Sequence, residues 1–242
     1  MLLPYGDNLT RGRFFFGVIL LVSLMLILDV PTFLDADLEE WSIRYLSFVP
    51  LLFSISPWSH VHTLLTSVFL HQDIFHLAGN CLFLWVFGRS LERLFGLLIF
   101  LLAFPFLGVV GLLAHWALFP ASRAPVIGAS GAIATLMGAY LALFPAARMR
   151  MVLFLGVFFK RFQVPAWVFL LYWGALQLLS LVFGSGGEDN VAYAVHVGGF
   201  AVGVLGAMVW KVTYPFAEEH LSEFMQIAST GARSALAAKR LT

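Results

Sequence analysis

Charged side chains are scarce in this sequence. Only 11% of its 242 residues are Asp, Glu, Lys or Arg, whereas a soluble domain carries about 25%. Hydrophobic residues make up 61% of the chain, and its mean hydropathy is +0.92. So little charge excludes an ordinary water-soluble globular domain. The expected surroundings are a lipid bilayer, which a helix of about 20 predominantly apolar residues can span.

Cysteine and excess positive charge are also nearly absent. The single cysteine, Cys81, excludes an internal disulfide framework. The net charge of +1 leaves no basic face that could neutralise the phosphates of a nucleic acid. We therefore expect the lipid bilayer, and no nucleic acid, as a partner of this chain.

Apolar residues concentrate in six stretches that are long enough to be membrane spans. They cover residues 14–30, 73–93, 95–118, 128–144, 165–184 and 191–212. The first stretch is not followed by the small-x-small cleavage site of a signal peptide, so we interpret it as a retained span. The sequence predicts an all-α polytopic membrane protein with a six-transmembrane-helix domain over residues 14–212.

Four of the segments outside the predicted spans can be assigned a place. Residues 1–13 and 213–242 are expected to be cytoplasmic terminal segments. The segment 31–72 mixes aromatic and acidic residues, which is typical of structures at the membrane interface. Residues 151–159 are apolar but too few to span, and basic pairs flank them, so we expect them at the membrane surface.

The distribution of Lys and Arg predicts the orientation. If the N-terminus is cytoplasmic, 12 of the 14 basic residues fall in cytoplasmic segments, and only Arg44 and Arg123 lie on the outer side. This bias follows the positive-inside rule. We therefore expect a multi-pass protein with both termini in the cytoplasm, in a bacterial inner membrane.

Ser130 is the candidate nucleophile. It lies in the sequence Gly-Ala-Ser-Gly-Ala at the start of the fourth predicted span, where a serine among small residues is more often a helix-packing residue. As a helix, residues 128–144 would be about 25 Å long, whereas the hydrocarbon core is about 30 Å thick. Because Pro145 and the basic residues after it fix the inner end, Ser130 is expected in a depression open to water from outside. Free N–H groups at the helix N-terminus favour a developing oxyanion there.

His196 is the candidate general base. It lies near the outer end of the sixth predicted span and is followed by Gly199 and Gly203, a spacing that lets a neighbouring helix approach closely. Small residues in the fourth span, including Gly131, offer a matching stripe, so close packing would bring His196 beside Ser130. A serine hydroxyl needs such a base to become nucleophilic. A packing histidine is the alternative interpretation.

A third catalytic residue is not expected. All 13 acidic residues fall in loops, tails or span ends, and the nearest candidates are Asp73 and Asp189. An ionised carboxylate in the middle of a bilayer is also expensive. The sequence therefore predicts a Ser-His dyad.

His76 and Asn80 are four residues apart and share one face of the second predicted span. Both can donate hydrogen bonds, as an oxyanion hole requires, although interhelical hydrogen bonding would explain them equally well. His60, His62 and His71 lie nearby. Since the sequence has no H-E-x-x-H motif and only one carboxylate close to these histidines, we expect neither a metal site nor a cofactor.

Together these residues resemble the rhomboid family over nearly the whole chain, from Phe14 to Trp210. The family's histidine and asparagine, four apart on the second helix, correspond to His76 and Asn80. Its G-x-S-G pattern is present at residues 128–131. Its sixth-helix pattern, a histidine followed by two glycines, is present as His196, Gly199 and Gly203. Each motif alone is weak, but the three in order on the expected spans are specific.

The resemblance implies a serine endopeptidase that cleaves the transmembrane segments of membrane-protein substrates, with Ser130 and His196 as the dyad. It implies an oxyanion hole formed by His76, Asn80 and the Ser130 backbone N–H. The glycines expected to pack near the site are Gly128, Gly131, Gly199 and Gly203.

The resemblance further implies that the fifth span and the loop 185–190 form a lateral gate. In the family an aromatic residue four positions after the serine often packs on the histidine. That position is Ala134 here, so either something else orients His196 or its placement is looser.

Two other functions stay open. A rhomboid-like protein that binds membrane clients without cutting them would lack the serine or the histidine, and this chain has both. A small transporter would need broken helices in both halves. Pro105 is the only proline in the interior of a predicted span, and it has no counterpart in the other half.

Overall fold

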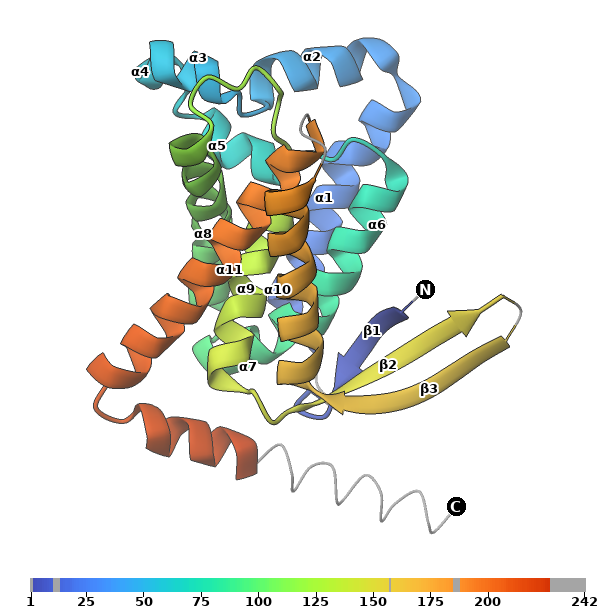
Figure 1. Cartoon of the computed structure of the whole chain (residues 1–242), viewed down its shortest axis with the longest axis vertical. Helices are drawn as coiled ribbons and strands as arrows, with labels where there is room; N and C mark the ends of the chain where they lie inside the picture. The colour runs from blue at the N-terminus through green and yellow to red at the C-terminus, as the bar shows by residue number, and fades with distance from the viewer. Residues whose placement is uncertain (1, 11–13, 157, 185–187, 227–242) are drawn as a thin grey trace.

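The computed structural model describes residues 2–10, 14–156, 158–184 and 188–226, leaving out the side chains of residues 155 and 188–192. Within these ranges the chain forms a bundle of helices, with short helices across one end and a small sheet at the other (Figure 1). Five of its helical segments are long and apolar enough to cross a membrane. They are α1 (Phe16–Leu34), Ile74–Phe95, α8 (Leu97–Leu118), α10 (Ala166–Phe183) and Tyr193–Thr213 of α11 (Glu188–Thr213).

The second of these segments is interrupted by a π-helical turn. It consists of α6 (Ile74–Phe83), η2 (Leu84–Gly88) and α7 (Arg89–Phe95). A sixth apolar helix, α9 (Ser130–Leu143), is shorter than the others. The prediction of an all-α polytopic membrane protein is confirmed.

The short helix α9 lies in the middle of the bundle. Ten of its 14 residues are buried, and it packs against α8 and α11. At 1.5 Å per residue it is about 21 Å long, well short of the roughly 30 Å hydrocarbon core of a bilayer. A helix this short and this buried can hold its first residue below the ends of the surrounding spans.

The backbones of α9 and α11 touch. A Cβ atom added at Gly203 would lie 2.0 Å from the carbonyl oxygen of Thr135, and one added at Gly138 would lie 2.1 Å from that of Phe200. A Cβ at Gly199 would lie 2.7 Å from the Gly131 carbonyl oxygen. Since no side chain fits at such distances, glycine is required wherever these two helices cross.

The segment between the first two spans covers one end of the bundle (Figure 1). It contains α2 (Ala36–Leu46), α3 (Pro50–Ile55), α4 (Pro57–His60), α5 (Thr63–Thr66) and η1 (Ser67–Phe69). Asp35 caps α2 by accepting hydrogen bonds from two backbone N–H groups of its first turn. Trp41, Tyr45 and Trp58 are exposed, as aromatic residues are at a membrane–water interface.

The first helix extends four residues beyond the predicted end of the first span. The helix α1 continues through Pro31 to Leu34 instead of ending at residue 30. Pro31 is therefore a second proline inside a spanning helix, beside Pro105. Since Pro31 lies in the last turn, it removes only one backbone hydrogen bond from the helix.

A three-stranded antiparallel sheet lies at the opposite end of the bundle (Figure 1). Its strands, in spatial order, are β1 (Leu2–Asp7), β2 (Arg148–Leu155) and β3 (Phe158–Pro165). The sequence analysis expected a surface segment at residues 151–159 but no sheet. The pairing joins the N-terminus to a connection far along the chain, which no local pattern reveals.

Both terminal segments pack on this end of the bundle. Asp7 is buried and accepts hydrogen bonds from Thr10 and from the Tyr140 hydroxyl of α9, the latter at 2.8 Å. Residues 217–226 are helical, and Phe224 stacks on Phe144 with ring centroids 5.1 Å apart. The end of α9 next to the sheet is therefore held from two sides.

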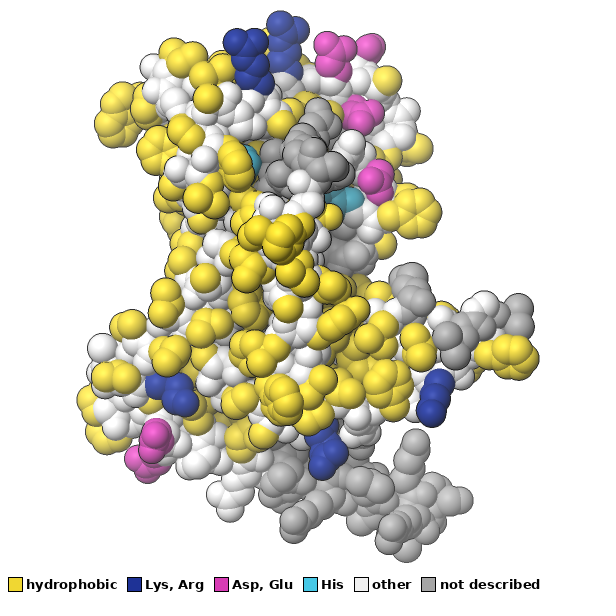
Figure 2. Space-filling model, viewed as in Figure 1, with side chains coloured by type: hydrophobic (Ala, Val, Ile, Leu, Met, Phe, Trp, Pro, Cys, Tyr) yellow, Lys and Arg dark blue, Asp and Glu magenta, His cyan; other side chains and the backbone are white. Residues whose placement is uncertain are grey.

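Figure 2 shows the charged side chains at the two ends of the visible face, with hydrophobic side chains between them. A surface of this kind matches a bilayer with water on both sides.

Candidate active site

One cavity of about 230 Å³ is lined by all four polar candidates from the sequence: Ser130, His196, His76 and Asn80. They come from three elements, namely α9, α11 and α6. The rest of the wall is mainly apolar and consists of Phe75, Gly79, Phe83, Ile133, Met137 and Trp173. A small cavity with a few convergent polar groups is the usual form of a binding or catalytic site.

Ser130 is the first residue of α9 and is partly exposed. Its helix begins after Ala129 without a side-chain cap. The N–H groups of the first helical turn have no partner within the helix, and the helix dipole adds positive potential at this end. The surroundings of the serine therefore favour a negative charge.

Gly128 holds the backbone just before Ser130. Its φ of +120° lies in a region that residues with a side chain rarely adopt, and a Cβ atom here would lie 2.9 Å from the His76 imidazole. Its N–H donates to the Ser67 carbonyl at 2.8 Å. Gly128 thus precedes α9, and its close neighbour is the His76 ring. Helix packing, the role that the sequence analysis gave it, belongs to Gly131, Gly199 and Gly203.

Asn80 presents a free donor in the cavity wall. Its side-chain Nδ2 is buried and has no hydrogen-bond partner within the described part of the chain. A buried amide without a partner is costly unless it serves another group. Its position beside Ser130 and His76 is suited to an oxyanion that forms in the cavity.

His196 is held from α10. Its Nδ1 donates to the Gln177 side-chain oxygen at 2.7 Å, and the Trp173 ring lies 5.8 Å from the imidazole, centroid to centroid. Because an amide oxygen can only accept, the imidazole proton is on Nδ1 and Nε2 is free to take a proton. These two residues supply the orientation that Ala134 cannot. The sequence analysis missed Gln177, although a glutamine inside an apolar span is itself a signal.

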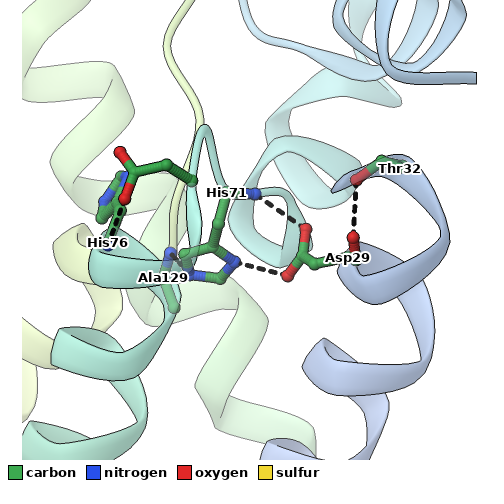
Figure 3. Close-up of polar contacts among 6 residues, drawn as sticks. Asp29, Thr32, His71, His76 and Ala129 are labelled. Atoms are coloured by element: carbon green, nitrogen blue, oxygen red, sulfur yellow. Dashed lines mark hydrogen bonds and ion pairs between the residues drawn. The ribbon is translucent and has the colours of Figure 1, made fainter. Parts of the chain in front are cut away.

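A second polar cluster supports the backbone before Ser130 (Figure 3). His71 Nδ1 donates to Asp29 Oδ2 at 2.7 Å, and the His71 backbone N–H donates to Asp29 Oδ1 at 2.9 Å. Both side chains are fully buried. The other ring nitrogen of His71, Nε2, accepts from the Ala129 N–H at 3.5 Å. Asp29 therefore holds the His71 ring in the orientation in which Nε2 faces the loop leading into α9.

This cluster changes the expectation about acidic residues. The sequence analysis named Asp73 and Asp189 as the nearest carboxylates and did not consider Asp29. Asp29 is linked to the cavity through His71, whose ring contacts the His76 ring edge to face with centroids 5.2 Å apart. Asp73 caps α6 by accepting from the N–H groups of His76 and Phe75, and these hydrogen bonds lower the pKa of its carboxyl group. The side chain of Asp189 lies outside the described residues.

The helix α10 is loosely packed at the end away from the sheet. Its buried residues are Ala166, Phe169 and Leu170, all in the part next to the sheet. The part away from the sheet, which carries Trp173 and Gln177, has no fully buried residue. Of the predicted gate loop 185–190, residues 185–187 lie outside the described part of the chain.

The residues that the structure describes include no group of three or more His, Cys, Asp or Glu side chains that could hold a metal ion. The polar groups of the cavity are instead a hydroxyl, two imidazoles and an amide. Such a set suits nucleophilic and acid–base chemistry.

Comparison with known proteins gives a family match and several relatives. Residues 58–212 match a protein-family model that is described as "Rhomboid domain". The chain is 32% identical over 166 residues to RHOMBOID-like protein 12, mitochondrial, of Arabidopsis thaliana, covering 62% of this chain and 46% of that protein. It is 35% identical over 151 residues to Rhomboid protein 1, mitochondrial, of Saccharomyces cerevisiae, covering 59% and 40%. It is 44% identical over 78 residues to Rhomboid protease GluP of Bacillus subtilis, covering 32% and 15%.

The chain thus spans less than half the length of these relatives. The apolar helices identify an integral multi-pass membrane protein. Two of the three relatives are named as mitochondrial, so the expectation of a bacterial inner membrane is not supported.

Proposed function

The chain belongs to the rhomboid family, and on this premise we propose that it is an intramembrane serine endopeptidase that cuts transmembrane segments of membrane proteins. The observation that carries the proposal is the single cavity lined by Ser130, His196, His76 and Asn80. The proposed protease domain covers residues 14–212, with both termini on the cytoplasmic side. The substrates are membrane proteins whose spans reach the cavity from the bilayer.

In the proposed reaction His196 Nε2 takes the proton of the Ser130 hydroxyl as Oγ attacks the scissile carbonyl. The tetrahedral oxyanion receives hydrogen bonds from the Asn80 amide, the His76 ring and the Ser130 backbone N–H. His196 then gives its proton to the leaving amine, and water hydrolyses the acyl-enzyme with the same histidine as base. In this scheme the Gln177 side-chain oxygen accepts from Nδ1, which leaves Nε2 of the neutral imidazole free to act as the base.

We propose that substrates arrive past the outer part of α10. This part of the helix has no fully buried residue, so moving it disturbs little packing. It also forms one wall of the cavity through Trp173. The alternative function is that of a protein that binds membrane clients without cutting them. The two hypotheses differ in whether Ser130 is nucleophilic.

A serine-directed fluorophosphonate probe tests the proposal. The wild-type protein in detergent is expected to be labelled, and Ser130→Ala is expected to lose the label while remaining folded. Ser180→Ala, a change at another serine on a spanning helix, is the matched control and should keep it. Equal labelling of Ser130→Ala and the wild type would exclude Ser130 as nucleophile and favour the client-binding alternative.

Asn80→Ala is expected to lower kcat by roughly 10- to 1000-fold with little change in KM, because one oxyanion donor acts mainly in the transition state. His76→Ala should behave similarly. Steady-state cleavage of a reconstituted transmembrane substrate measures both constants. Unchanged rates in both variants would mean that this face of α6 serves only helix packing.

Gln177→Leu is expected to lower kcat by up to about 100-fold, the order of effect that a misplacement of about 1 Å produces. Gln177→Glu keeps an oxygen that accepts from Nδ1 and should retain much more activity. The comparison of kcat between these variants, at equal thermal stability, is the measurement. Equal losses in both would show that Gln177 does not orient the imidazole.

A further inference from the structure

The β2–β3 hairpin leaves the bundle at the level where a membrane-spanning helix begins. β3 ends at Pro165 and α10 starts at Ala166. The join is fixed, because Ala166 N–H donates to the Ala147 carbonyl and Trp167 N–H to the Pro145 carbonyl. The hairpin then extends sideways and obliquely upward, beyond the outline of the helices (Figure 1). A structure that leaves the bundle where α10 begins is close to the surface of a bilayer that α10 spans.

The two faces of the hairpin differ. Side chains alternate between the faces of a sheet, so the register Met149–Val164, Met151–Phe162 and Leu153–Lys160 defines one face that is apolar except for the lysine. The pairs Arg150–Gln163, Val152–Arg161 and Phe154–Phe159 define the other, which is basic near the bundle. The faces therefore differ near the bundle, whereas toward the tip both carry a large apolar side chain, Phe159 on one face and Phe158 on the other.

The apolar face is turned toward the spanning helix. Met151, Phe162 and Val164 share a cavity of about 160 Å³ with Val168 and Tyr172 of α10. Near the bundle this face is therefore covered by α10, and the part of the hairpin that is free to meet lipid is its tip.

The tip of the hairpin exposes large apolar side chains. Phe158 is 74% exposed, Phe159 59% and Phe154 42%. Figure 2 shows hydrophobic side chains at the tip and a Lys or Arg side chain on its lower side. Rings of this size on a free edge of the molecule are unfavourable in water and favourable at the boundary between headgroups and acyl chains.

The charge of the hairpin is of one sign. Residues 148–165 contain four basic side chains and no acidic one. They are Arg148, Arg150, Lys160 and Arg161, of which Arg148, Lys160 and Arg161 are exposed. The Arg161 guanidinium lies 5.3 Å above the Phe159 ring, so cation and aromatic ring point the same way. Basic clusters beside exposed apolar residues are attracted by anionic lipid headgroups.

We propose that the β2–β3 hairpin is a lipid-binding element that lies in the interface of the leaflet at the sheet end of the molecule. Phe154, Phe158 and Phe159 enter the acyl-chain boundary, while Lys160 and Arg161 bind anionic headgroups. The proposal does not depend on proteolytic activity, because it rests on the hairpin alone.

Spin-label accessibility in vesicles tests it. In a Cys81→Ser background the full chain carries one label at a Phe158→Cys change. It is reconstituted into phosphatidylcholine vesicles with and without roughly a third of anionic phosphatidylglycerol. The measured quantity is the ratio of the label's collision rate with dissolved oxygen to its collision rate with a water-soluble nickel complex. We expect this ratio to be severalfold higher when the anionic lipid is present.

Charge variants complete the test. Lys160→Gln with Arg161→Gln should remove the difference between the two vesicle types. Arg44→Gln with Arg123→Gln, the same loss of charge outside the hairpin, should preserve it. A label exposed to water in both vesicle types would overturn the proposal and point to a protein partner for this face. Equal burial in both would overturn the binding of anionic headgroups.

Discussion

Alanine at either Ser130 or His196 is expected to lower cleavage of a reconstituted transmembrane substrate by roughly 10⁴-fold or more. The reason is that the hydroxyl is a poor nucleophile without a base, and the imidazole has nothing to activate without the hydroxyl. The two residues act as a unit, so the double variant should be no slower than either single one. Turnover and thermal unfolding, measured on the same preparations, separate lost chemistry from lost folding.

His62→Ala is a suitable control for the histidine change. His62 is exposed on the segment before α5 and contacts the Tyr45 backbone, so its loss should leave turnover near the wild-type value. Substantial cleavage by Ser130→Ala or His196→Ala would contradict the dyad. The family membership of the chain would still stand.

Gly203→Ala is expected to have the largest effect on folding. Its new Cβ would meet the Thr135 carbonyl oxygen at 2.0 Å and the Ala139 nitrogen at 3.0 Å. Both are backbone atoms, so no side-chain rotation can relieve the contact, and α9 and α11 would have to move apart. Overpacking of this kind costs about 3 kcal/mol or more. Since His196 and Ser130 sit on these two helices, activity should fall as well.

The same helix supplies the control for this change. A Cβ atom at Gly206 would meet nothing within 4 Å, and alanine is the better helix former. Gly206→Ala should therefore unfold like the wild type or slightly later. Denaturant unfolding in mixed micelles measures both variants, and equal midpoints for Gly203→Ala and the wild type would contradict the contact.

The spans and the four cavity residues could be predicted from the sequence because both depend on local signals. A run of apolar residues reports a span wherever it occurs, and polar residues within such runs stand out. The histidine and asparagine four apart, and the glycines that follow His196, lie on single helices, so their spacing fixes which face they share.

The supporting residues could not be predicted because they depend on how helices meet. Asp29 lies in α1, and His71 lies in the segment between the first two spans. Only the packing of α1 against this segment shows that the two residues pair. Gln177 and Trp173 likewise reach His196 from α10. The sequence at Ala134 indicated that another group could orient His196, but it could not indicate that this group comes from α10.

The hydrogen bond between Gln177 and His196 has a consequence for the order of events in the proposed proteolysis. If α10 moves aside to admit a substrate, it carries away the group that aligns the histidine. Access and reactivity would then be greatest at different moments, and bond cleavage would have to wait until α10 returns. A rigid substrate helix that holds α10 in the open position would leave uncut, whereas a substrate segment that unwinds and lets α10 return would be hydrolysed. Substrate specificity would then depend more on how long the substrate segment stays unwound than on which side chains it carries.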